Sequence, residues 1–232
     1  MSRPFLTAEW RKLAMANFVV DPELLRPYLP AKTEIDLWNG KCYISLVAFM
    51  FINTRLLGIK IPFHINFEEI NLRFYVRHGD KRGVVFLKEI VSRPALSFIA
   101  NTLYKEKYET RPTDHSWIHA PGTLNVEYRW KKVDWNVFRV STEKTPVPIV
   151  DGSEEEFISE HYWGYSKANA NHSFEYHVEH PRWEVYPVRS YRMEVDFEAL
   201  YGRDFGFLSK QKPASVFLAE GSAIAIMNKQ KI

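Results

Sequence analysis

The chain has 232 residues, with 31 lysines and arginines against 28 aspartates and glutamates, so its formal net charge is +3. A hydrophobic content of 46% is ordinary for a globular protein and excludes a disordered or fibrous chain. The basic residues are scattered, which argues against a nucleic-acid partner. No apolar run reaches the ~20 residues of a membrane-spanning helix. The single Cys42 excludes an internal disulfide and favours the cytoplasm, so we expect a cytoplasmic protein without a membrane partner.

No internal repeat and no linker rich in Gly, Ser or Pro divides the chain, so we expect a single domain over residues 1–232. Aromatic residues make up 15% of the sequence and accompany strand-like segments throughout. This combination predicts an α+β protein that is mainly β. The sequence contains no Walker A, dinucleotide-binding, GxSxG or HExxH pattern, so we predict neither a cofactor nor a metal.

The first half of the chain predicts one short helix followed by long strands. Asp21 can cap a helix that begins at Pro22. Residues 42–52 are apolar on both faces, as in a strand buried on two sides. Residues 66–77 alternate, and residues 83–91 would form their hairpin partner. The two faces of the alternating strand carry different sets of side chains, namely Glu69, Asn71 and Arg73 on one and Glu68, Ile70, Leu72, Phe74 and Val76 on the other.

The second half predicts helices near Pro94 and Ser153 among further strands. In the first helix, one stripe would hold Leu96, Ile99, Leu103 and Lys107. Ser153 and Glu156 form a capping box, with Gly164 as the helix stop. Gly221 indicates a bulge or a close backbone approach in the last strand. The predicted strands are 124–130, 136–141, 173–179, 191–197 and 215–227.

Glu69, Asn71 and Arg73 place an acid, an amide and a cation at two-residue spacing on one strand face. Such a ladder fits the lining of a pocket, and it equally fits a solvent-exposed face with cross-strand ion pairs. If the Glu69 face points inward, the interior is polar and suits a ligand. If the Glu68 face points inward, the interior is a packed apolar core.

Lys107 is the candidate nucleophile, because a desolvated lysine favours the neutral amine that forms a Schiff base with a carbonyl substrate. In the alternative, the helix has frayed by this point and Lys107 points to water.

The eight histidines do not predict a metal site. Glu175, His177 and Glu179 share one strand face, which we interpret as solvated. His180 shares the opposite face with apolar residues, so it is either a hydrogen-bonded core histidine or a residue of a site.

Five segments taken together resemble the YqjF-like family, which is largely uncharacterised and belongs to the acetoacetate-decarboxylase-like superfamily. They are DPELLRPYLP (21–30), FEEINLRFYV (67–76), EHYWGY (160–165), VEHPRWEVY (178–186) and FLAEGSAIAI (217–226). The resemblance covers nearly the whole chain. It implies a curved antiparallel sheet that closes into a cone-like barrel, with a few packed helices and a small-molecule cavity inside.

In acetoacetate decarboxylase a lysine forms a Schiff base with the substrate, and a second lysine keeps it neutral. By similarity, Arg11 stands at the place of the carboxylate-binding arginine. Two acids of that site fall near Ser45 and Leu56, neither of which is acidic. The lysine pair is replaced by Lys105, Glu106 and Lys107, and a carboxylate beside a lysine favours its charged form. The resemblance therefore does not predict classical acetoacetate decarboxylation.

We expect a protein that binds a small organic molecule, with a carboxylate as the leading class, in its barrel. The expected binding residues are Arg11, Glu69, Asn71, Arg73, His180 and Trp183. The first alternative is a lyase in which Lys107 or Lys105 forms a Schiff base with a keto acid or an aldehyde. The second is a structural or protein-interaction module whose barrel is filled by its own side chains. The sequence leaves a homo-oligomer open.

Overall fold

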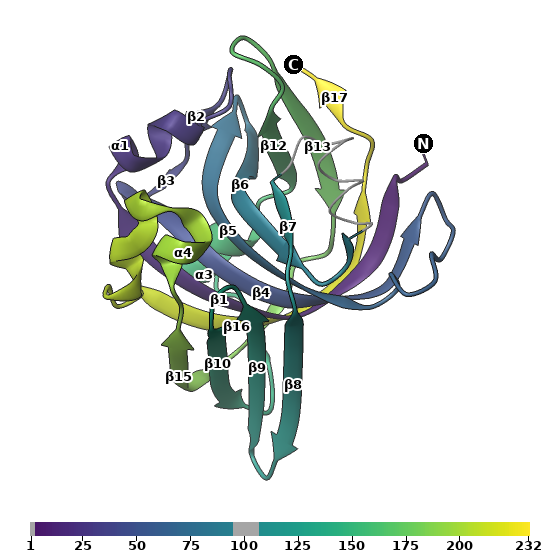
Figure 1. The fold of residues 1–232 in the computed structure, drawn as a ribbon, viewed down its shortest axis with the longest axis vertical. Helices are drawn as coiled ribbons and strands as arrows, with labels where there is room; N and C mark the ends of the chain where they lie inside the picture. The colour runs from purple at the N-terminus through teal and green to yellow at the C-terminus, as the bar shows by residue number, and fades with distance from the viewer. Residues whose placement is uncertain (1–2, 95–106) are drawn as a thin grey trace.

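The computed structural model describes residues 3–94 and 107–232. Within them, seven strands follow one another around a closed ring (Figure 1). In ring order the strands are β16 (Ser215–Ile226), β1 (Leu6–Val20), β4 (Lys41–Leu56), β5 (Phe67–His78), β6 (Lys81–Val91), β12 (Trp163–Lys167) and β13 (Ser173–Glu179). Of the predicted helix that follows Pro94, positions 95–106 lie outside the described residues.

The ring closes where β13 meets β16. That contact is short, because it consists of the pairs Val178 with Ile226 and Glu179 with Ala225. Neighbouring strands of the ring are antiparallel except β6 and β12, which run parallel. The predicted mainly-β fold with a curved sheet and a few packed helices is confirmed, although the sheet closes as a ring of seven strands and not as a clean barrel. Six short strands extend this sheet: β2 (Glu34–Ile35), β3 (Leu37–Trp38), β7 (Tyr108–Thr110), β11 (Val147–Pro148), β14 (Glu184–Tyr186) and β17 (Gln230–Lys231).

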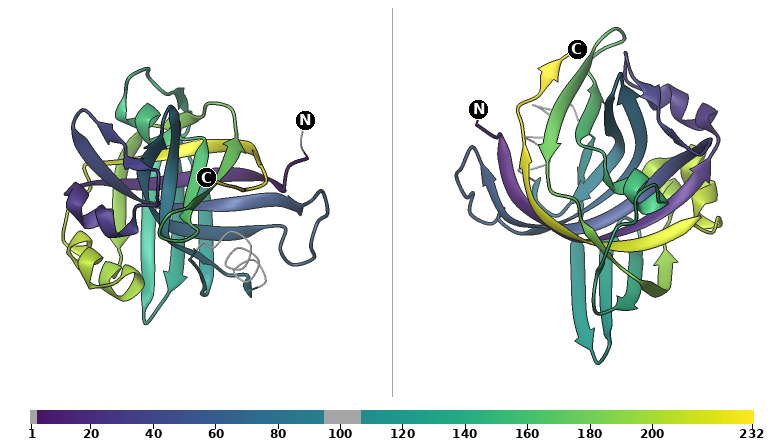
Figure 2. Two further views of the ribbon diagram at one scale, coloured as in Figure 1. Left: turned by 90° about the horizontal axis from the view of Figure 1, so that it is seen from above. Right: turned by 180° about the vertical axis from the view of Figure 1, so that it is seen from behind.

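A second sheet of four antiparallel strands packs on the outside of the ring. Its order is β15 (Val188–Glu194), β10 (Trp135–Glu143), β9 (Thr123–Lys131) and β8 (Thr113–Ala120). Figures 1 and 2 show it projecting from the side where β1, β4 and β16 cross. The described helical segments are short: α1 (Pro22–Leu25), η1 (Arg26–Tyr28), α3 (Glu154–Ser159), α4 (Phe197–Tyr201) and η3 (Arg203–Ser209). None of the described helices is both long and apolar enough to cross a membrane.

The core is divided in two by the wall of the ring. Outside the wall, Leu72 and Phe74 of β5 pack in one cluster with Tyr128 and Trp130 of β9. Inside, a second cluster includes Tyr75 of β5 together with aromatic residues of β4. Because successive side chains of a strand point to opposite faces, β4 and β5 supply both clusters at once. This explains why residues 42–51 are buried without a break.

Several local predictions are confirmed, whereas the predicted end of one helix and that of one strand are wrong: the strand predicted over 191–197 ends at Glu194, and Phe197 begins a helix. Asp21 accepts a hydrogen bond from the backbone N–H of Glu23, and Ser153 accepts one from that of Glu156. However, the helix that Ser153 caps ends at Ser159 rather than at Gly164. Gly164 lies in β12 instead, where an added Cβ would come 2.1 Å from the Tyr176 ring. The close approach of that ring, and not a helix end, requires the glycine.

Gly221 marks a close backbone approach, as predicted. Its φ is +80°, and a Cβ at this position would lie 2.0 Å from the carbonyl oxygen of Trp10. On the paired strand β1, Lys12 also has a positive φ of 55°. The pairing of β1 with β4 shifts register between Arg11 and Ala14, so this point is a bulge in the sheet.

Candidate functional site

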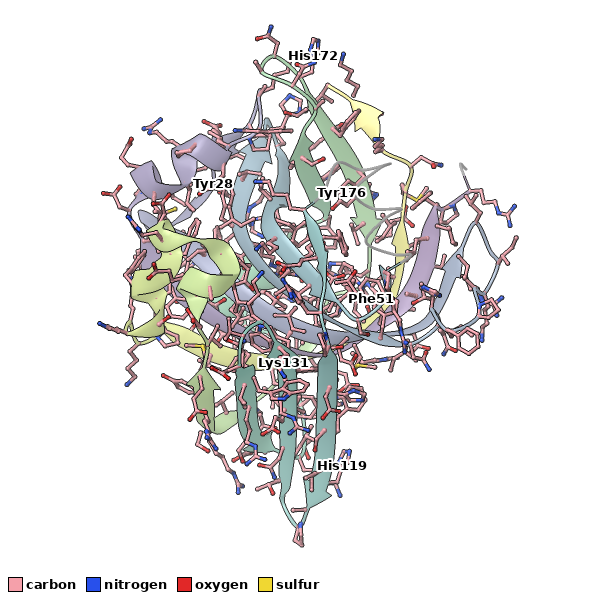
Figure 3. All side chains as sticks on the ribbon, in the orientation of Figure 1. Tyr28, Phe51, His119, Lys131, His172 and Tyr176 are labelled. Carbon is pink, nitrogen blue, oxygen red and sulfur yellow. The ribbon has the colours of Figure 1, made fainter. Side chains whose placement is uncertain are left out.

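A cavity of about 60 Å³ lies inside the ring. By the usual allowance of roughly 10–15 Å³ for each water molecule, it can hold about four to six waters or a ligand of similar size. Figure 3 labels two of its wall residues, Phe51 on β4 and Tyr176 on β13. The polar and aromatic side chains that line it include Trp10, Glu69, Arg73, Glu89, Tyr108, Ser159, His161, Tyr176, His180 and Trp183.

Strand β5 turns its Glu69 face toward this cavity. Glu69 and Arg73 both line the cavity. Asn71, which stands between them in the sequence and on the same strand face, is buried. The opposite face of the strand packs in the outer core. This answers the question that the sequence left open, because the ladder of acid, amide and cation is an interior feature and not a solvated surface.

Glu69 is held in the cavity by two neutral donors. Asn71 Nδ2 donates to its Oε1 over 3.1 Å, and the Tyr108 hydroxyl donates to its Oε2 over 3.2 Å. Burial raises the pKa of Glu69 to about 7, against the opposing effects of these hydrogen bonds and of the Arg73 charge. Glu69 therefore exchanges a proton near neutral pH.

Tyr108 and Glu89 extend this acidic group. Glu89 lies on β6 opposite Asn71, and it is 2% exposed. Burial, together with the carboxylates of Glu69 and Glu89, raises the pKa of Tyr108 well above its ordinary value. The phenol therefore keeps its proton and acts as a donor to the carboxylates beside it.

Arg73 is the one arginine or lysine among the described residues that line the cavity. It is 8% exposed, and its Nη2 donates to the carbonyl oxygen of Ile158 over 3.3 Å. Its Nε is buried and has no hydrogen-bond partner among the described residues. A buried guanidinium with an available N–H is well suited to bind a carboxylate, because charge-assisted hydrogen bonds are about twice as strong as neutral ones.

His161, which the sequence analysis did not select, is also a residue of the cavity lining. Its Nε2 lies 3.2 Å from Oδ2 of Asp36, and that carboxylate also accepts a hydrogen bond from Arg82 Nε over 2.7 Å. Burial lowers the pKa of His161 to about 4, although the bond to Asp36 opposes this. The sequence gives no local signal for this pair, because the two residues are 125 positions apart.

His180 and Trp183 form an aromatic wall. Their rings stack with centroids 4.3 Å apart, and the Tyr162 ring also stacks on His180, with centroids 4.6 Å apart. Trp183 Nε1 donates to Ser222 Oγ over 2.9 Å. Burial lowers the pKa of His180, so its imidazole favours the neutral form. Both predicted residues thus line the same cavity as Glu69 and Arg73.

The other predicted site residues lie elsewhere or outside the described residues. Arg11 is half-buried and pairs with Glu9 at 2.6 Å, and it does not line the cavity. Lys107 is exposed, with its Nζ 5.4 Å from the centre of the Tyr28 ring. Lys105 is outside the described residues. The roles assigned to Arg11, Lys105 and Lys107 stay predictions.

The strand face with Glu175 is not uniformly solvated, contrary to expectation. Glu175 is 1% exposed and accepts hydrogen bonds from Lys81 Nζ and Gln230 Nε2, each over 2.6 Å. His177 packs against the Trp163 ring. Over residues 3–94 and 107–232, no group of three or more His, Cys, Asp or Glu side chains is placed to hold a metal ion.

Comparison with known sequences gives the family. The DUF2071 family, described as an uncharacterized conserved protein, matches residues 7–223. The chain belongs to this family. A curated relative, the uncharacterized protein YqjF of Bacillus subtilis (strain 168), is 37% identical over 78 residues, which are 33% of this chain and 32% of YqjF. The match spans about a third of YqjF, and it confirms the predicted YqjF-like resemblance.

Solved structures confirm the acetoacetate-decarboxylase-like fold of this DUF2071 chain. An acetoacetate decarboxylase-like enzyme from Sphingomonas wittichii RW1 has a TM-score of 0.65 at 12% identity, covering 100% of this chain and 94% of that one. Acetoacetate decarboxylase from Legionella pneumophila gives 0.66 at 12% identity, covering 99% and 87%. The enduracididine biosynthesis enzyme MppR complexed with pyruvate gives 0.68 at 10% identity, covering 100% and 91%. Identities this low show a shared fold alone.

Proposed function

We propose that this DUF2071 protein binds a small organic acid in the cavity and that Arg73 pairs with the carboxylate. The observation that carries the proposal is the buried Arg73 guanidinium, whose Nε lacks a hydrogen-bond partner among the described residues. Leaving such a donor unsatisfied in a buried site is costly, and a carboxylate satisfies it with a charge-assisted bond.

The neighbouring acids give the proposed site a pH dependence. Glu69, Glu89 and Tyr108 share the cavity with Arg73, so an incoming carboxylate meets repulsion when Glu69 is ionised. Because burial raises the pKa of Glu69 to about 7, this acid can take up a proton as the ligand enters. Affinity is therefore expected to rise as the pH falls from 8 to 6.

The size of the cavity limits the ligand. A volume of about 60 Å³ is well below the roughly 300 Å³ or more of a site for a drug-sized molecule. Acids of three or four carbons fit this limit. Pyruvate, the ligand in one MppR complex, is an acid of this size. The proposal favours non-covalent binding over catalysis, because no lysine is among the described lining residues. It also includes a cytoplasmic location, as expected from the sequence.

The test is a calorimetric titration of propionate into the wild type, Arg73→Met and Arg11→Ala at pH 6. Losing the charged contact in Arg73→Met is expected to weaken binding by at least about tenfold. Arg11→Ala is the matched control, since it also removes one arginine, and it is expected to bind as the wild type does. Weakening by Arg11→Ala alone would place the anion at Arg11 and contradict the proposal.

A further inference from the structure

His161, a residue of the cavity lining, carries a buried hydrogen-bond acceptor without a partner among the described residues. Its side chain is fully buried, and it lines the same space as Arg73. Nδ1 has no hydrogen-bond partner among the described residues, whereas Nε2 lies 3.2 Å from Asp36. The ring is therefore fixed on one side, and its buried nitrogen on the other side has an unused hydrogen-bonding capacity.

Asp36 decides which nitrogen of His161 carries the proton. Although burial acts to raise it, hydrogen bonds from His161 and Arg82 hold the pKa of Asp36 below its ordinary value, so this residue is an acceptor. A carboxylate can bond to Nε2 only if that nitrogen carries the hydrogen. In the neutral ring, Nδ1 then presents a lone pair, and the ligand atom that faces it must carry a hydrogen.

Two donors share the cavity with this acceptor. Trp10 Nε1 and Ser159 Oγ are buried lining atoms without a hydrogen-bond partner among the described residues. A ligand hydroxyl can donate to Nδ1 and accept from one of these groups at the same time. A keto oxygen can only accept, and a methylene group can do neither.

We propose that the acid bound by this cavity is a small hydroxy acid and that His161 selects its hydroxyl group. This inference rests on the proposed function, since Arg73 is taken to hold the carboxylate. Asp36 is a positioning residue that acts through the tautomer of His161.

Three acids of three carbons test this selection, because lactate, pyruvate and propionate differ only at the second carbon. In a titration of wild-type protein at pH 6, lactate is expected to bind about tenfold more tightly than propionate or pyruvate. A difference of this size corresponds to one buried hydrogen bond. Equal binding of all three would overturn the hydroxyl selection while leaving Arg73 in place. If none of them binds, the proposed function itself fails.

His161→Phe supplies the second arm of the experiment. Phenylalanine keeps an aromatic ring beside Tyr75 and Phe157 but has no acceptor. The preference for lactate is expected to disappear, so that lactate and propionate bind with about equal affinity. A retained preference would contradict the role of His161.

In the wild type, ¹⁵N NMR is expected to show that His161 is protonated at Nε2. The Nδ1 resonance is expected to shift when lactate is added but not when propionate is added. This readout stands even if the variant does not fold, and an Nδ1-protonated ring would overturn the proposal.

Discussion

Glu68 and Glu69 are consecutive residues of β5, and their carboxylates lie on opposite sides of the ring wall. Glu68 meets the second sheet, where His115 Nδ1 and Thr113 Oγ1 each lie 2.6 Å from its oxygens. Glu69 faces the cavity. Burial acts to raise the pKa of Glu68, but the bonds from His115 and Thr113 outweigh it and lower that pKa to about 2. Glu69, with weaker donors, has a pKa raised to about 7. The charged form of Glu68 is therefore stabilised in the fold, whereas the charged form of Glu69 is disfavoured in the cavity.

Glu69→Gln is expected to stabilise the protein at pH 8 relative to the wild type. The pKa of Glu69 rises from 4.5 to about 7 on folding, because burial disfavours its charge. The contribution of Glu69 to the free energy of unfolding is therefore fully present below pH 4.5. It falls by about 3 kcal/mol as the pH rises to about 7. Urea unfolding of both proteins from pH 4.5 to 8 should show the advantage of the variant growing by that amount. A difference that is constant over this range would contradict the role of Glu69.

Glu68→Gln is expected to show the opposite pH dependence. The pKa of Glu68 falls from 4.5 to about 2 on folding, so its stabilising effect is present above pH 4.5 and is lost as the pH falls toward 2. With allowance for solvent screening, the variant should lose about 2 kcal/mol at pH 7 and almost nothing near pH 2. Denaturant unfolding at pH 3, 5 and 7 measures this. A variant as stable as the wild type at pH 7 would show that the Glu68 contacts contribute nothing.

Gly221→Ala is expected to destabilise the fold by about 3 kcal/mol or more, because its Cβ would collide with the Trp10 carbonyl. Gly79→Ala is the matched control. It also has a positive φ, of 60°, but its Cβ would meet nothing within 4 Å. It should cost about 1–2 kcal/mol, the cost of the left-handed conformation alone. Thermal unfolding of both variants tests the close approach of residue 221 to the Trp10 carbonyl. An equal loss of stability in the two variants would contradict it.

Borohydride trapping tests the Schiff-base alternative. We expect pyruvate and borohydride to leave no adduct on the wild type, because no described cavity-lining residue is a lysine and Lys107 is exposed. Intact mass and peptide mapping provide the readout. A substrate-dependent adduct at Lys105 or Lys107 that disappears when that lysine is changed to alanine would establish Schiff-base chemistry and overturn the priority given to non-covalent binding.

The sequence could predict elements whose signal is local. Alternation in residues 66–77 and the apolar run at 42–52 correctly indicated β5 and β4. The strand β1 (Leu6–Val20) was not predicted, since its bulge at Lys12 interrupts the alternation of a long strand. Periodicity likewise could not say which face of β5 lies inside, because both faces are buried.

The candidate site could be predicted only in part, because only some of its residues have a local signal in the sequence. Four predicted residues gather at one place: Glu69 and Arg73 from β5, and His180 and Trp183 from the loop before β14. His161 and Glu89 were missed. Their places in the cavity depend on contacts between segments far apart in the sequence, such as Asp36 with His161, which no spacing within a segment can reveal.

The most direct test of the account is a crystal structure of the protein with propionate bound. The account predicts the carboxylate within hydrogen-bond distance of Arg73 Nε, inside the ring and close to Glu69. A carboxylate bound instead at Arg11, or a cavity closed entirely by protein side chains, would contradict it.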